Sequence, residues 1–382
     1  MSTEHIRAQI HRALAAAGLD TRTGVARGVL DTIEQALGAA GMPQRPGAAP
    51  PPSTRTADTT QLVIDVEGRS LDDPGEPGWA PPSAVEPRSG RFLDHRHTGP
   101  HGSRTYKLYV PSSYREGVRM PLIVMLHGCK QDPADFARGT RMNEVAEDNG
   151  LLVAYPAQSR KANGSNCWRW FERDQQHRGG AEPSIIVAMV AEIARAFTVD
   201  ARRVYVAGLS AGGAMAMILS DTHPDVFAAA AAHSGLPPGA ATDVPSAFAA
   251  MQGAAGAGPR RAVPPRRGAP GRAVPTIVFH GDADATVVPA NGEAIASHAL
   301  TRLEAERGPL ARVVEQRTCQ GSRCIRTTHR DSDGTPVVEH WTVQGAGHAW
   351  MGGSTAGSFA TPHGPQASRE MVRFFSLHTR PT

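Results

Sequence analysis

From residue 91 onward, short apolar runs alternate with segments whose apolar positions recur every three or four residues. The short runs predict these strands: Tyr106–Val110, Leu122–Leu126, Leu151–Tyr155, Val204–Ala207, Ala228–Ala232, Thr276–Phe279 and Val337–Val343. The helical pattern predicts these helices: Thr140–Asn149, Ile185–Phe197, Ala211–Leu219, Asn291–Ala305 and Ala367–His378. Strands separated by helices are typical of βαβ units, so we expect an α/β domain with a mostly parallel sheet covered on both faces.

The first 90 residues follow two other patterns. In residues 1–41 apolar residues such as Ile6 and Ile10 recur every four positions, which predicts a helical hairpin with one apolar stripe. Residues 42–90 are rich in Pro, Gly, Ser and Thr, cannot bury enough apolar surface to fold alone, and predict a linker. We therefore expect a helical segment, a linker and one folded domain over 91–382.

A second tract rich in Pro and Gly, residues 236–275, interrupts the alternation and predicts a mobile insertion. It contains the tight basic cluster Arg260-Arg261 and Arg266-Arg267, in a chain with a formal net charge of +4. No aromatic residues for base stacking lie among these arginines, which favours a solvated loop over a nucleic-acid surface. No stretch approaches the roughly 20 apolar residues of a membrane-spanning helix, so we expect no transmembrane segment.

The N-terminal sequence MSTEHIRAQIHRALAAAGLD carries a charge every few residues and lacks the apolar core of a signal peptide. We therefore expect no export signal there, which leaves the compartment open and the cytoplasm as one alternative. The four cysteines are compatible with two disulfides, but their redox state stays open for the same reason.

The sequence VYVAGLSAGGAM, residues 204–215, places Ser210 in a G-x-S-x-G pattern between a β-branched strand and a helix. A sharp strand-to-helix turn of this kind exposes the serine hydroxyl at the carboxyl edge of the sheet, and glycines leave room for it. This context favours Ser210 as a nucleophile over a simple turn residue.

A serine hydroxyl needs a base, and the base needs an acid that orients it. His348 follows the last predicted strand in a glycine-flanked loop, and the expected chain order of Ser, acid, His leaves two carboxylates after an earlier strand, Asp282 and Asp284. We favour Asp284, because Asp282 is closer to the strand and suits a turn cap. The backbone N–H groups of Ala211 and Cys129 are the expected donors to the oxyanion.

Five stretches now carry a resemblance: LHGCKQDPADFA, NCWRWF, RVYVAGLSAGGAMA, FHGDADATV and GAGHAWMGG. In this order, from about Arg91 to the C-terminus, they resemble the polyhydroxybutyrate depolymerase-type esterases of the α/β-hydrolase fold. The resemblance implies Ser210, Asp284 and His348 as catalytic residues and Cys129 with Ala211 as the oxyanion hole. It also implies hydrolysis of short-chain hydroxyalkanoate esters without a cofactor, with feruloyl and acetylxylan esterases as close cousins. Many members of this family are exported.

The cysteines and tryptophans near these stretches suggest further roles. Cys129 and Cys167 lie in two family-like stretches, and a bond between them would fix the oxyanion loop. Cys319 and Cys324 could close a hairpin, and their pattern does not fit a zinc site. Two tryptophans beside the expected site are candidates for lining an apolar trough, with core packing as the alternative: Trp168 and Trp350.

We therefore expect a serine esterase that acts on a polyhydroxyalkanoate or a related aliphatic ester, with no metal and no nucleic-acid partner. One alternative is a feruloyl- or acetylxylan-type carbohydrate esterase with the same catalytic residues. Another, from a different class, is a protein that binds polymer granules or surfaces through the apolar stripe of residues 1–41.

Overall fold

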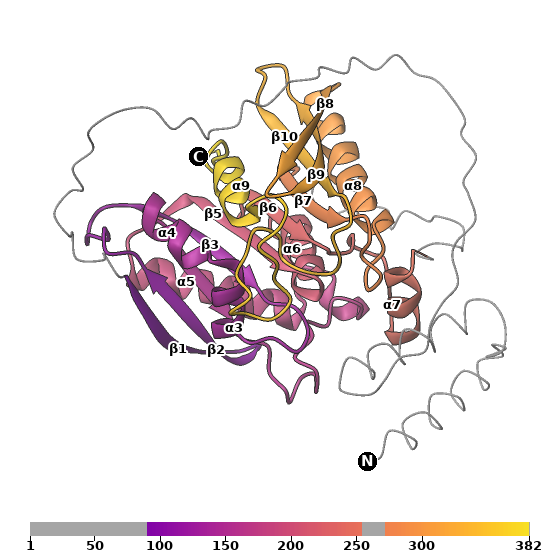
Figure 1. Cartoon of the computed structure of the whole chain (residues 1–382). Helices are drawn as coiled ribbons and strands as arrows, with labels where there is room; N and C mark the ends of the chain where they lie inside the picture. Colours follow the sequence, from indigo (N-terminus) through magenta and orange to yellow (C-terminus); the bar gives the residue numbers. More distant parts are fainter. Residues whose placement is uncertain (1–89, 254–271, 382) are drawn as a thin grey trace, which may run out of the picture. The chain divides into compact units, whose positions relative to one another are not determined.

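The structure, a computed structural model, describes residues 90–253 and 272–381 (Figure 1). The helical segment expected over 1–41 lies outside the described residues, as does all but the last residue of the linker expected over 42–90. The folded domain expected from residue 91 begins with a strand at Arg91.

A ten-stranded sheet forms the centre of this domain, in the order β1-β2-β4-β3-β5-β6-β7-β10-β9-β8. The strands are β1 (Arg91–Gly99), β2 (Gly102–Val110), β3 (Met120–Leu126), β4 (Leu152–Pro156), β5 (Val199–Leu209), β6 (Ala229–His233), β7 (Thr276–Gly281), β8 (Ala311–Cys319), β9 (Ser322–Arg330) and β10 (Pro336–Val343). The six central strands, from β4 to β10, pair in parallel, and the outer pairs at both ends are antiparallel. The expected mostly parallel sheet is confirmed.

Helices cover both faces of the sheet (Figure 1). They are α3 (Pro133–Thr140), α4 (Met142–Asn149), α5 (Ala181–Ala196), α6 (Ala211–Thr222), α7 (Val244–Met251), α8 (Ala290–Arg307) and α9 (Ala367–Phe375), with the 3-10 turn η1 (Arg173–Gln175). Alternate residues of β3 face opposite ways: Leu122 joins the apolar cluster under α5 and α6, whereas Ile123 joins the one under α3, α4 and α9. None of the described helices is long and apolar enough to cross a bilayer.

The expected insertion over 236–275 is corrected in part. Its middle, residues 254–271, lies outside the described residues, but its first part is folded. Leu236 is buried, and α7 is preceded by the N-cap residue Asp243, whose side chain and backbone form a capping box with Ser246. A capping box satisfies free N–H groups at the start of a short helix. The sequence did not predict this helix because the segment has a low-complexity composition.

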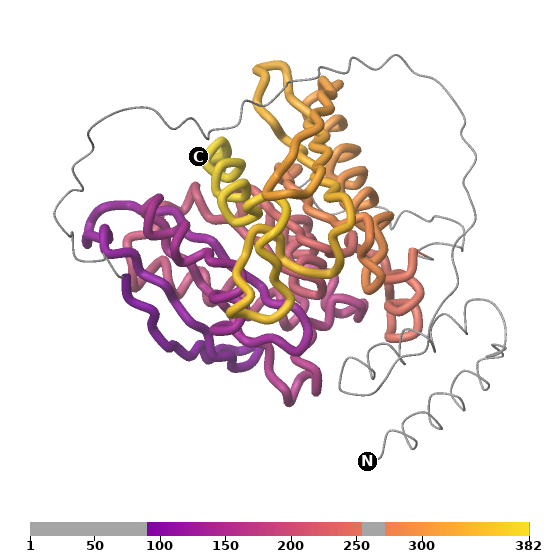
Figure 2. The backbone as a smooth tube through the Cα atoms, viewed as in Figure 1, coloured from indigo at the N-terminus to yellow at the C-terminus, as the bar shows by residue number. Residues whose placement is uncertain are grey.

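The chain after β10 returns across the sheet edge and lies against α3 (Figure 2). The N–H of Ser354 donates to the carbonyl oxygen of Gly139 at 2.8 Å, and Asp135 accepts hydrogen bonds from the N–H and hydroxyl of Ser358. This loop therefore brings the segment around residue 358 beside the loop that follows β3.

Candidate active site

Ser210 lies at the sharp turn between β5 and α6. Its backbone has φ 57° and ψ −120°, a conformation that costs free energy for any residue with a Cβ. A Cβ on Gly208 would lie 2.3 Å from the Gly212 carbonyl carbon, and one on Gly212 would lie 2.0 Å from the Leu126 oxygen. Both glycines are therefore required for this turn, which presents Ser210 at the carboxyl edge of the sheet.

Asp284 and His348 follow β7 and β10, which are parallel neighbours. The Nδ1 of His348 lies 2.8 Å from the Oδ2 of Asp284, and the other carboxylate oxygen accepts hydrogen bonds from the N–H groups of Thr286 and Val287. Burial alone would raise the pKa of the Asp284 carboxyl, but the hydrogen bond and charge of His348 and the Val287 N–H hold that pKa below its usual range. The Asp284 side chain is thus an ionised, fixed partner for the imidazole.

Asp282 has different surroundings. It is exposed, and its Oδ1 accepts a hydrogen bond from the Gly345 N–H at 2.6 Å. The N–H of the next residue, Ala283, donates to the carbonyl oxygen of Ala346 at 3.1 Å. Asp282 therefore joins the turn after β7 to the turn before His348, and of the two carboxylates only Asp284 contacts the imidazole.

The Ser210 hydroxyl has no hydrogen-bond partner among residues 90–253 and 272–381. The structure thus joins His348 to Asp284 and places Ser210 at the same edge, without a hydrogen bond between Ser210 and His348. Such bonds often form fully only once a substrate is bound.

The loop after β3 lies beside the nucleophile candidate. A Cβ on Gly128 would lie 3.6 Å from the Cβ of Ser210. Within the described chain, the next N–H, that of Cys129, donates to no acceptor. Ala211 is the first residue of α6, where an N–H has no partner within the helix. Both predicted donors therefore border the serine with free N–H groups.

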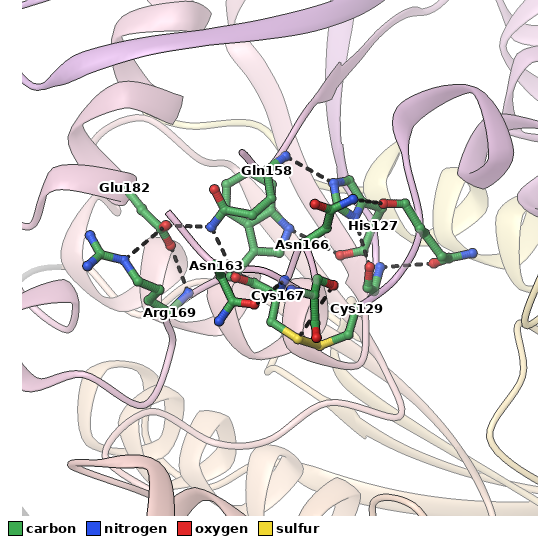
Figure 3. The surroundings of a disulfide bond; sticks show 12 residues. His127, Cys129, Gln158, Asn163, Asn166, Cys167, Arg169 and Glu182 are labelled. Carbon is green, nitrogen blue, oxygen red and sulfur yellow. Dashed lines mark hydrogen bonds and ion pairs between the residues drawn. A yellow bond between two sulfur atoms is a disulfide. The ribbon is translucent and has the colours of Figure 1, made fainter. Parts of the chain in front are cut away.

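A disulfide between Cys129 and Cys167 holds this loop, as the family resemblance implied (Figure 3). Beside it, the Lys130 N–H donates to the Ser165 carbonyl oxygen at 2.7 Å, and the Asn166 amide donates to the Gln131 carbonyl oxygen. The loop of the predicted oxyanion donor is thus fixed to a segment almost 40 residues away.

The second predicted disulfide is absent, because Cys319 and Cys324 are free thiols. They lie in the hairpin of β8 and β9, but Cys319 pairs with Ser322 and Cys324 pairs with Arg317. The two cysteines are therefore diagonal. Their thiols still interact, because a side-chain hydrogen bond between them lowers the pKa of Cys319 and raises the pKa of Cys324.

The structure also corrects the tryptophan prediction. Trp168 and Trp350 are each only 1% exposed. The indole N–H of Trp168 donates to the carbonyl oxygen of His127, and that of Trp350 donates to the hydroxyl of Ser368. Both rings are therefore packed in the core, and neither has a free surface for a substrate.

Two further residues support the site without having been singled out in the sequence. The Gln131 side chain accepts a hydrogen bond from the Gly128 N–H at 2.9 Å and donates one to the Ser358 carbonyl oxygen at 2.9 Å. His233 accepts a hydrogen bond from the Met351 N–H, and its carbonyl oxygen accepts one from the Ser210 N–H. Burial lowers the pKa of His233 to about 3, so its ring is neutral. Gln131 lies within a family-like stretch, which is the signal that could have identified it.

No group of three or more His, Cys, Asp and Glu side chains in the described part of the chain is arranged to hold a metal ion.

Comparison with known proteins gives a consistent picture. Residues 104–309 match the family model described as esterase PHB depolymerase. The chain is 32% identical over 255 residues to poly(3-hydroxyalkanoate) depolymerase C of Paucimonas lemoignei, covering 66% of this chain and 59% of that protein. It is 37% identical over 129 residues to feruloyl esterase B of Neurospora crassa, covering 34% and 42%. The chain thus spans well under two thirds of these relatives.

Among solved structures, an acetyl xylan esterase from Aspergillus awamori has a similar fold, with a TM-score of 0.58 and 18% identity over 75% of this chain and all of that one. The expected α/β-hydrolase fold is confirmed. With the family model matching more than half of its residues, the chain belongs to the esterase PHB depolymerase family.

Proposed function

We propose that this protein is a serine esterase that hydrolyses short-chain polyhydroxyalkanoates, such as poly-3-hydroxybutyrate, or related aliphatic esters. One observation carries the proposal: the strained turn of Ser210 lies at the same sheet edge as the hydrogen-bonded pair of His348 and Asp284. Family membership and the relationship to a poly(3-hydroxyalkanoate) depolymerase support the choice of substrate class.

The proposed reaction proceeds through an acyl-enzyme. The Ser210 Oγ attacks the ester carbonyl carbon while the Nε2 of His348 accepts its proton, and Asp284 stabilises the imidazolium through Nδ1. The negative oxygen of the tetrahedral intermediate accepts hydrogen bonds from the N–H groups of Cys129 and Ala211. His348 then gives its proton to the leaving alkoxide as the alcohol departs. A water molecule repeats the attack on the acyl carbon and releases the acid and the Ser210 hydroxyl.

A second candidate is a carbohydrate esterase of the feruloyl or acetylxylan type. A hollow of about 230 Å³ lies beside the turn that precedes His348, and all but one of its lining residues are polar: Asp282, Gln316, Arg323, Ile325, Thr342 and Gln344. The lining holds both donors and acceptors, which suits sugar hydroxyls because these both donate and accept hydrogen bonds, whereas the ester groups of a polyester only accept them. Turnover of acetylated xylan or feruloylated arabinoxylan above that of poly-3-hydroxybutyrate would favour this candidate.

The Ser210→Ala variant tests the proposed mechanism. Without the nucleophile, we expect kcat for p-nitrophenyl butyrate to fall by a factor of about 10⁴ or more. Folding is checked by the thermal unfolding midpoint, which the variant should keep because alanine retains the Cβ of serine and the lost hydroxyl makes no hydrogen bond in the described chain. Retained turnover in a folded variant would exclude Ser210 as the nucleophile and with it the proposed mechanism.

A further inference from the structure

Phe359, in the loop between β10 and α9, combines two unfavourable features. Its φ of 51° lies in the left-handed region, where a bulky side chain costs free energy. Of the non-glycine residues with positive φ in the described part of the chain, Phe359 alone is aromatic. Its side chain is nevertheless 43% exposed, and it joins no hydrophobic cluster and no ring pair among the described residues. Neither backbone preference nor burial explains a phenylalanine at this position.

Hydrogen bonds on both sides impose the conformation. The Phe359 carbonyl oxygen accepts a hydrogen bond from the Trp350 N–H at 2.7 Å, and the Thr361 N–H donates to the Trp350 carbonyl oxygen at 2.9 Å. On the other side, the Ser358 N–H donates to the carboxylate of Asp135. The surrounding loop therefore fixes the strained backbone and with it the direction in which the side chain leaves the chain.

Hydrogen bonds connect this position to the loop beside Ser210. The residue before Phe359, Ser358, accepts a hydrogen bond from the Gln131 side chain, which in turn accepts one from the Gly128 N–H. The Cβ position of Gly128 lies 3.6 Å from the Cβ of Ser210. Phe359 is therefore attached, through one side chain, to the loop that carries the predicted oxyanion donor.

We propose that the Phe359 ring is an apolar contact for the acyl group of the ester and determines acyl-chain preference; this rests on the proposed esterase function. When an aliphatic chain covers an exposed aromatic ring, apolar surface of both leaves water and the free energy of the complex is lowered. Strained backbone is typical of ligand-contacting positions, where the surrounding structure holds a residue that would not otherwise adopt the conformation. An aliphatic acyl chain fits this ring because the ring offers apolar surface and no hydrogen-bonding group.

Two substitutions separate the roles of ring and backbone. Phe359→Ala removes the ring and keeps a Cβ at positive φ, whereas Phe359→Gly removes the ring and relieves the strain. In both variants we expect the ratio of kcat/KM for p-nitrophenyl hexanoate to that for p-nitrophenyl acetate to fall about tenfold, mainly through KM. We also expect Phe359→Gly to unfold a few degrees above Phe359→Ala, about 2–4 °C. Leu377→Ala, at a second exposed apolar residue beyond α9, is the control and should leave the ratio unchanged.

An unchanged ratio in both Phe359 variants of an active enzyme would overturn this inference and leave the esterase proposal intact. A wild-type protein that hydrolyses none of these esters would overturn both. A Phe359→Gly variant less stable than Phe359→Ala would show that the backbone is not strained, and the argument from strain would fail.

Discussion

Asp282 and Asp284 lie two residues apart after β7 and meet different surroundings. Asp284 is 2% exposed and accepts hydrogen bonds from His348 and from two backbone N–H groups. Asp282 is exposed and accepts one from Gly345. A buried carboxylate with several donors is held ionised and in one orientation, which is what an imidazole that must gain a proton requires.

The two aspartates allow a matched test. In Asp284→Asn, the side-chain amide can donate to the Nδ1 of His348 and favour the wrong tautomer, so we expect kcat for p-nitrophenyl butyrate to fall by about 10³–10⁴. In Asp282→Asn, the amide oxygen can still accept from Gly345, so the loss should be less than about tenfold. Similar losses in the two variants would show that Asp284 is not the orienting acid.

For single residues, the sequence predicted where the site residues lie in the fold better than it predicted which side chains are buried. Ser210, Asp284 and His348 each follow a strand, and parallel strands end at one edge, so their common location could be inferred. The burial of Trp168 could not, because its indole pairs with the His127 carbonyl oxygen 41 positions away. Whether a tryptophan lines a surface or fills the core depends on such distant partners, and a single sequence does not show them.

At the scale of elements, the loop after β3 is held by both a covalent bond and hydrogen bonds. The disulfide joins Cys129 to Cys167, and the Gln131 side chain joins the loop to the segment of Ser358. The Cys129 N–H, proposed to bind the oxyanion, therefore lies between a covalent and a hydrogen-bonded support. Fixed donors are effective because they need no reorganisation when charge develops.

Replacing both disulfide cysteines by serine tests this support. The backbone N–H of residue 129 remains, but the closed loop of 38 residues is lost. We expect the free energy of unfolding, measured in urea, to fall by about 3 kcal/mol, and kcat for p-nitrophenyl butyrate to fall about tenfold. The control replaces the free thiols Cys319 and Cys324 by serine and should leave kcat unchanged. Lower stability with unchanged kcat would mean that the disulfide does not position the oxyanion donor.

The strands that the sequence failed to predict lie at the two ends of the sheet, and the short helices α3 and α7 were also not predicted. The seven predicted strands are present, with bounds shifted by a few residues, whereas β1, β8 and β9 were not anticipated as strands. These three strands are partly exposed and rich in Arg, His and Thr, so they lack the continuous apolar run of a buried parallel strand. β1 pairs with β2, β9 pairs with β10, and β8 pairs with β9, so their place in the sheet depends on partner strands and not on their own sequence.

At the scale of the whole molecule, buried histidines make the free energy of unfolding depend on pH. Of the described histidines that are less than 10% exposed, we consider three: His223, His233 and His378. In each, burial is the largest cause that lowers the pKa, to about 4 for His223 and His378 and to about 3 for His233. In the unfolded chain a histidine takes up its proton near pH 6.5. Between about pH 6.5 and pH 4 the unfolded state therefore binds more protons, so the free energy of unfolding falls as the pH falls.

His378 provides a specific test of this dependence. Its ring centroid lies 4.6 Å from that of Phe374, and a phenylalanine at position 378 would keep a ring there without a titrating group. Lowering the pH from 8 to 5 should cost the wild-type protein about 2 kcal/mol through this one histidine, so His378→Phe should reduce the pH-dependent loss in urea unfolding by that amount. Phe374→Leu weakens packing against the same ring and should lower stability equally at both pH values. If His378→Phe loses as much stability on acidification as the wild type, His378 is not a source of the pH dependence.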